Sequence, residues 1–81
     1  MKYLYVVSNH QGHSLAIFET KELAIQSLIE THCTLNAKLE KFESELTKQI
    51  QCEFFWNVGG VFKYALFFIE PVLYYNHVEH L

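Results

Sequence analysis

Hydrophobic and polar positions change their spacing along this chain, and each change marks an expected element. Residues 2–9 (KYLYVVSN) and 14–19 (SLAIFE) are rich in β-branched and aromatic side chains, which favour strands. Between them lies HQGH, in which Gly12 can take the positive φ of a turn. The pattern predicts an N-terminal β-hairpin.

Apolar residues then recur at steps of three and four through residues 21–49, which contain no glycine or proline. Thr20 is suited to cap a helix, and Glu22 lies in its first turn, where the helix dipole favours a carboxylate. We expect one long amphipathic helix, with a break near Thr34 as the alternative. The apolar stripe consists of Ile25, Leu28, His32, Leu35, Leu39, Phe42 and Leu46.

Residues 50–69 switch to a period of two, and Gly59 and Gly60 divide them in a way that suits a primed hairpin turn. If Val58 pairs with Val61, one face of the hairpin is almost wholly apolar and packs under the helix. The second face keeps five large apolar side chains among polar ones, and one helix cannot cover both faces. These five are Phe55, Phe62, Tyr64, Leu66 and Phe68.

Pro71 is expected to end this hairpin. Val72, Tyr75, Val78 and Leu81 then recur at steps of three, which favours a short helix over part of the second face, with an extended tail as the alternative. The whole pattern predicts a single α+β domain over residues 1–81. Its order is ββαββ, an antiparallel sheet of two hairpins packed on one long helix, plus a short C-terminal element.

Composition adds an expectation of association. The chain has 81 residues, of which 51% are hydrophobic and 16% aromatic, which is rich for a chain with so little interior. Its formal net charge is −3 and it contains no arginine, so direct nucleic-acid binding is not expected.

The expected compartment depends on whether the sequence contains a membrane span or a secretory signal. Lys63 interrupts the apolar segment 54–68, so we expect no membrane span, and the N-terminus does not read as a secretory signal. The cytoplasm is then the expected compartment, where Cys33 and Cys52 stay reduced. We expect both to be buried and inert, with a disulfide or a reactive thiol as the alternative.

Five histidines raise the question of a metal site. His10 and His13 share a turn, and His77 and His80 lie near the end of the sequence, so together they could supply tetrahedral zinc ligands. Their spacing matches no strong zinc pattern, and we expect solvated side chains and no cofactor. His32 belongs to the apolar stripe, so we expect a hydrogen-bonded histidine at the edge of the core, with a pH-sensing role as the alternative.

The first thirty residues carry a resemblance. KYLYVVSN, a turn and AIFETKELAIQSLIE, with the helix start at Thr20 to Ala24, resemble the opening of many small phage and prophage accessory proteins. The resemblance implies a stand-alone protein that occupies a surface of a host protein, a class that includes inhibitors of bacterial defence systems. It implies no catalytic residue.

No motif in the sequence carries a known chemistry, so we expect a non-enzymatic protein-interaction module. It would be a homodimer that binds and inhibits or modulates a host protein. The five apolar residues of the second face would bind the partner, and the helix stripe would form the dimer seam through Leu35, Leu39, Phe42 and Leu46. The alternatives are a histidine-based metal- or small-ligand-binding domain and a self-assembling structural subunit.

Overall fold

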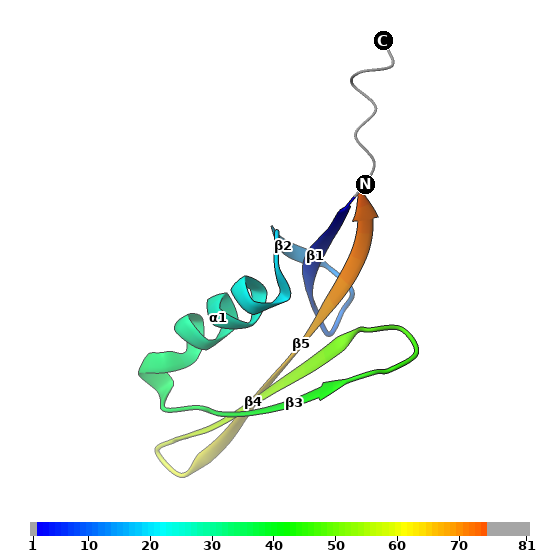
Figure 1. The fold of residues 1–81 in the computed structure, drawn as a ribbon. Coiled ribbons are helices and arrows are strands. Elements are labelled where there is room, and N and C mark those ends of the chain that lie inside the picture. The colour runs from blue at the N-terminus through cyan, green and yellow to red at the C-terminus, as the bar shows by residue number, and fades with distance from the viewer. Residues whose placement is uncertain (1, 75–81) are drawn as a thin grey trace.

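The computed structural model describes residues 2–74, which form a five-stranded antiparallel sheet with one α-helix beside it (Figure 1). The helix α1 spans Lys21–His32 and leads into a 3₁₀ turn at Cys33–Leu35. The order of strands across the sheet is β2-β1-β5-β4-β3. In chain order the strands are β1 (Lys2–Asn9), β2 (Ser14–Phe18), β3 (Lys38–Glu43), β4 (Ile50–Val58) and β5 (Val61–Tyr74).

The 14-residue strand β5 joins two halves of the sheet. Along one side it pairs with β4 over residues 61–69, and along the other side it pairs with β1 over residues 67–74. Figure 1 shows β5 running from the turn after β4 to the N-terminus, with the β1–β2 hairpin beside only its later part. The two predicted hairpins are thus neighbours in one sheet, joined through a pairing of β1 with β5.

The N-terminal hairpin is confirmed. Its turn is held by Asn9, whose side-chain Oδ1 accepts hydrogen bonds from the backbone N–H groups of Gln11 (3.0 Å) and His13 (2.9 Å). Gly12 has φ 85°, a value that glycine adopts without steric cost.

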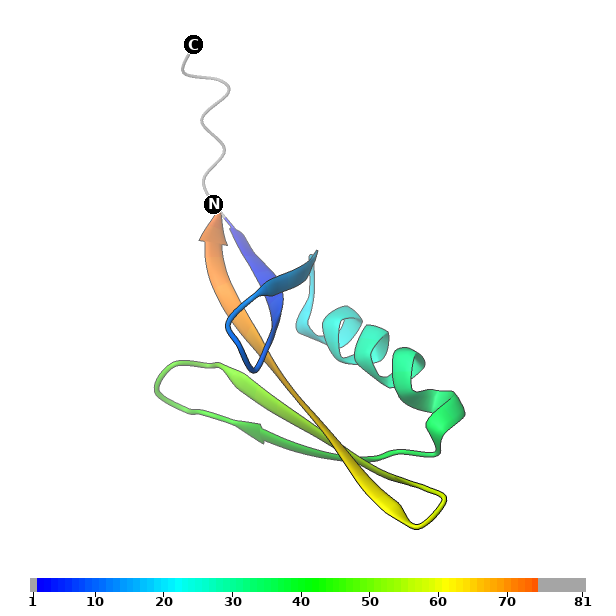
Figure 2. The same ribbon diagram turned by 180° about the vertical axis from the view of Figure 1, so that it is seen from behind.

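The helix begins as predicted and ends much earlier. The Thr20 hydroxyl caps it by accepting a hydrogen bond from the Leu23 N–H at 3.1 Å. Figures 1 and 2 show α1 along one side of the sheet. The expected helix over residues 21–49 is wrong, and the alternative of a break near Thr34 agrees with the structure. Asn36 ends the helical segment in the left-handed region (φ 55°), which asparagine tolerates better than most residues.

Residues 38–43, which the stripe placed in the helix, form β3 at the edge of the sheet. Steps of three and four between Leu35, Leu39 and Phe42 fit a helix, but this segment instead pairs its backbone with β4. Leu39 lies opposite Phe54 and packs against the core. Pairing with a strand distant in sequence therefore overrides the local helical pattern, and the order is ββαβββ.

The hairpin of β4 and β5 has the predicted register, with Val58 opposite Val61 and Ile50 opposite Ile69. Gly59 (φ 57°) and Gly60 (φ 84°) both have positive φ, as a type I′ turn requires. The side-chain Oδ1 of Asn57 accepts a hydrogen bond from the Gly60 N–H at 2.9 Å, which also holds the turn.

The core lies between α1 and one face of the sheet, as predicted for the more apolar face of this hairpin. The helix contributes residues spaced four apart, which share one side of a helix. Val58 and Val61, at the far end of the same face, are exposed. The buried apolar residues are Val7, Ala24, Leu28, Ile50, Cys52, Phe54 and Ile69.

Pro71 does not end the hairpin, because β5 continues through it to Tyr74. Proline lacks the N–H that a strand donates, so it is tolerated only where no neighbouring strand needs that donor. Backbone N–H and C=O groups alternate in direction along a strand, so Pro71 faces the same side of β5 as Val61 and Ile69, the side of β4. The pairing with β4 stops at Ile69, so no strand on that side needs an N–H from residue 71. Residues 75–81, where most of the expected C-terminal helix falls, lie outside the described residues.

Candidate interaction surface

The face of the sheet opposite α1, here called the open face, has no helix or loop packed over it among residues 2–74. The register shows which side chains share it, because neighbours directly opposite each other project to the same side. All five residues predicted for the second face project here. The apolar members are Leu4, Val6, Ile17, Phe42, Phe55, Phe62, Tyr64, Leu66, Phe68, Val72 and Tyr74.

Several of these side chains are exposed to an extent that is unusual for large apolar groups. Phe62 is 80% exposed, Phe42 68%, Ile17 63% and Tyr64 53%. Phe55 and Tyr64 contact each other with ring centroids 5.2 Å apart. The predicted five are therefore brought together, and residues of β1, β2 and β3 extend the patch beyond the prediction.

The sequence indicates these added residues only in part. Leu4 and Val6 alternate along β1, but only the pairing of β1 with β5 brings them beside Phe68 and Val72. Because that pairing joins residues 2–9 with residues 67–74, which are far apart in the sequence, no local pattern indicates it.

Three carboxylates project to the open face, those of Glu40, Glu53 and Glu70, and Glu53 accepts hydrogen bonds from neighbouring side chains. Glu53 accepts a hydrogen bond from the Gln51 side-chain amide at 2.9 Å and another from the Tyr64 hydroxyl at 3.1 Å. Desolvation, the hydrogen bond to Glu53 and the negative charge of that carboxylate raise the pKa of the Tyr64 hydroxyl. The charge of Glu53 is thus held in a fixed position by two donors.

The four residues predicted as a dimer seam do not form a stripe. Leu35 lies in the 3₁₀ turn, and Leu46 lies in the β3–β4 connection, where it is 96% exposed. Leu39 projects toward the core and Phe42 toward the open face, because strand neighbours three apart point to opposite sides. A seam that depends on a continuous helix is therefore wrong, and only Phe42 joins the patch.

His32 is buried at 7% exposure in the core, as expected for a stripe position. Its ring stacks on Phe54 at a centroid distance of 4.0 Å, and Phe67 meets its ring edge-on at 5.5 Å. Nδ1 lies 2.7 Å from the Leu28 carbonyl oxygen, so Nδ1 carries the proton that it donates. The expected hydrogen-bonded core-edge histidine is confirmed.

The two cysteines differ in their surroundings. Both are free thiols, but Cys33 is exposed, so the expectation that both are buried is wrong for Cys33. Burial raises the pKa of the Cys52 thiol to about 11, and the positive charge of Lys41 acts weakly in the opposite direction. A thiol with so high a pKa is not a nucleophile at neutral pH.

The histidines proposed as metal ligands are not gathered in the described part of the chain. Within residues 2–74 there is no group of three or more His, Cys, Asp or Glu side chains placed to hold an ion. His10 and His13 are exposed in the turn between β1 and β2. His77 and His80 lie outside the described residues.

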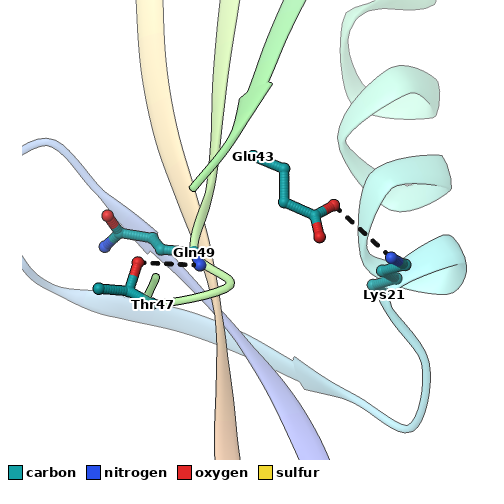
Figure 3. A network of polar contacts seen from close by, with 4 residues as sticks. All are labelled: Lys21, Glu43, Thr47 and Gln49. Carbon is teal, nitrogen blue, oxygen red and sulfur yellow. Dashed lines mark hydrogen bonds and ion pairs between the residues drawn. The ribbon is translucent and has the colours of Figure 1, made fainter. Parts of the chain in front are cut away.

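An open hollow of about 630 Å³ lies on the helix side, between β1, the start of α1 and the β3–β4 connection. Lys21 Nζ and Glu43 Oε1 form an ion pair of 3.6 Å at its edge, and the Thr47 hydroxyl accepts the Gln49 N–H at 3.2 Å nearby (Figure 3). The ion pair is solvated and contributes little stability. Of the histidines in residues 2–74, none lines this hollow.

Comparisons with known proteins identify no relative. No family model, no curated protein and no solved structure matches this chain. Among residues 2–74 the structure has no helix that is both long enough and apolar enough to cross a bilayer.

Proposed function

We propose that this chain is a non-enzymatic protein-interaction module. It pairs with a second copy through the open face and binds and modulates another protein. The observation that carries the proposal is the breadth of uncovered apolar surface, which includes three side chains more than 60% exposed: Ile17, Phe42 and Phe62. Contiguous apolar patches on small proteins usually mark interfaces.

The size of the open face supports a pair of copies. The strands have from five to fourteen residues, and each strand residue covers about 3.3 Å along the strand and about 4.8 Å across the sheet, so the face covers roughly 600 Å². Two such faces in contact would bury roughly 1,200 Å², the lower end of the range for specific interfaces. Two-fold pairing of like surfaces is the commonest arrangement of homo-oligomers.

The class of the second partner rests on the resemblance of the first thirty residues to phage and prophage accessory proteins. In this proposal the target is a bacterial host protein, and the two meet in the cytoplasm. Two free thiols fit a reducing compartment. Binding rather than catalysis accounts for a surface made mainly of aromatic and aliphatic groups, among which the carboxylate of Glu53 is held by hydrogen bonds and those of Glu40 and Glu70 project to the same side.

Affinity capture from a bacterial lysate tests the proposal. The bait is the immobilised protein, compared with Phe62→Lys/Tyr64→Lys, in which a new lysine can pair with Glu53. The control variant, Leu23→Lys/Ile29→Lys, has the same charge change on exposed positions of α1. We expect the same target to be retained by the unmodified and control baits and lost by the open-face variant. Equal retention by all three would contradict a role for the open face.

A further inference from the structure

Part of β5 has an unpaired backbone edge. Residues 61–66 pair with β4 on one side, but β1 begins to pair with β5 only at Phe67, so no strand among residues 2–74 lies along their other side. In a type I′ turn the Val61 N–H points toward Val58, and successive residues alternate. The N–H and C=O groups of Phe62, Tyr64 and Leu66 therefore point away from β4, into the free edge.

This edge lacks the protection that the outer edges of the sheet have. Proteins usually blunt an exposed edge with charges, with a very short strand or with a bulge. β3 carries four charged residues among its six, and β2 has only five residues with a register shift beside it. Along residues 61–66 the only charge is Lys63, and large apolar side chains alternate on the open face.

Space for another chain exists at this edge. A hollow of about 350 Å³ lies where β1 ends, lined by Asn9, His10 and residues 64–67 of β5. It lies on the same side of β5 as β1 and begins where the pairing with β1 ends, at Asn9 and Phe67. A segment placed here would follow the direction of β1 and pair antiparallel to β5.

We propose that the partner protein adds one extended segment to this edge as an antiparallel strand, an inference that rests on the proposed function. Apolar side chains of that segment would lie opposite Phe62, Tyr64 and Leu66 on the open face. An acidic side chain would lie opposite Lys63 on the other face, because neighbours in an antiparallel pair project to the same side. Strand addition gains its affinity from main-chain hydrogen bonds and its selectivity from alternate side chains.

A second copy of this chain does not fit the edge equally well. In a two-fold pair, the β5 strands of the two copies would run antiparallel along this edge, and residues opposite each other would have to lie on the same face. Two registers meet this condition and cover most of the edge, one with Tyr64 on the two-fold axis and one with Lys63 on it. With Tyr64 on the axis, the second copy's Val61 falls opposite Phe67, where Asn9 already pairs. With Lys63 on the axis, two lysines lie directly opposite, which is destabilising. Lys63 thus selects against self-pairing and for an acidic partner.

Fluorescence anisotropy with a synthetic strand tests the inference. The probe is the fluorescein-labelled peptide GSVTVEVSG, which places glutamate opposite Lys63, and GSVTVKVSG is its charge-reversed control. We expect the glutamate peptide to bind about threefold to tenfold more tightly than the lysine peptide, since each cross-strand charge contact contributes modestly. Lys63→Glu should reverse that preference.

Two variants separate edge binding from adhesion to the apolar face. Phe62→Pro removes a backbone N–H that points into the free edge and is not used in pairing with β4, whereas Phe62→Ala removes the same side chain and keeps the N–H. We expect Phe62→Pro to bind the glutamate peptide about tenfold more weakly than Phe62→Ala. Circular dichroism confirms that both variants are folded.

Two results would overturn the inference: no binding of the glutamate peptide at millimolar concentration, or equal affinity of the two Phe62 variants. The oligomeric state of the same samples distinguishes this failure from failure of the proposed function. A protein that is a dimer but does not bind the peptide would overturn only the strand-addition inference. A protein that is a monomer and binds the peptide through the edge would overturn only the proposed homodimer.

Discussion

Titration of the Cys52 thiol should make the protein less stable in alkaline solution. Burial raises the pKa of this thiol from 9.0 to about 11, so above the unfolded pKa the folded state binds more protons than the unfolded state. This contribution to stability is fully present below about pH 9 and is lost as the pH rises through about 11. At about pH 10 the loss is about 1.4 kcal/mol, one pKa unit of differential ionisation.

Urea denaturation at a series of pH values measures this loss, with the fluorescence of Trp56, the single tryptophan, as the signal. Cys52→Ala should start from a lower stability because it leaves a cavity, but it should lose about 1.4 kcal/mol less than the unmodified protein between about pH 8 and about pH 10. Cys33→Ala, which removes the exposed thiol, is the matched control and should keep the original slope. Parallel slopes for all three proteins would refute the buried placement of Cys52.

Three further substitutions test individual elements. His32→Ala should lower the free energy of unfolding by about 2 kcal/mol or more, because it removes a buried ring that stacks on the core. An unchanged free energy of unfolding, measured by urea denaturation, would contradict that packing. Asn36→Val should cost about 1–2 kcal/mol more than Asn36→Gly at the left-handed position that ends the helical segment, and equal stabilities would place the end of the helix elsewhere. Replacing Gly59 and Gly60 with two valines should lower the Tm more than replacing them with two asparagines, since an added Cβ meets no atom within 4 Å and only the positive φ matters; equal Tm values would contradict the type I′ turn.

The sequence predicted those elements whose partners are close along the chain. The hairpin of β4 and β5 followed from its alternation and from Gly59 and Gly60, and its register was correct to the residue. The helix start followed from Thr20, whose cap acts within one turn. In each case local chemistry and the fold favour the same conformation.

The errors arose where distant pairing decides the structure. Leu39 and Phe42 fit a helical stripe, and only the backbone of β4 makes their segment a strand. Pro71 reads as a strand terminator, yet it is tolerated because β4 has already ended on the side of its missing N–H. The open face was recognised in part from β4 and β5, while the pairing of β1 with β5 that enlarges it could not be predicted locally.

Light scattering of the purified protein at high micromolar concentration tests the central claim most directly. We expect the mass of a dimer for the unmodified protein and for Leu23→Lys/Ile29→Lys, and the mass of a folded monomer for Phe62→Lys/Tyr64→Lys. An unmodified protein that remains monomeric at that concentration would contradict pairing through the open face.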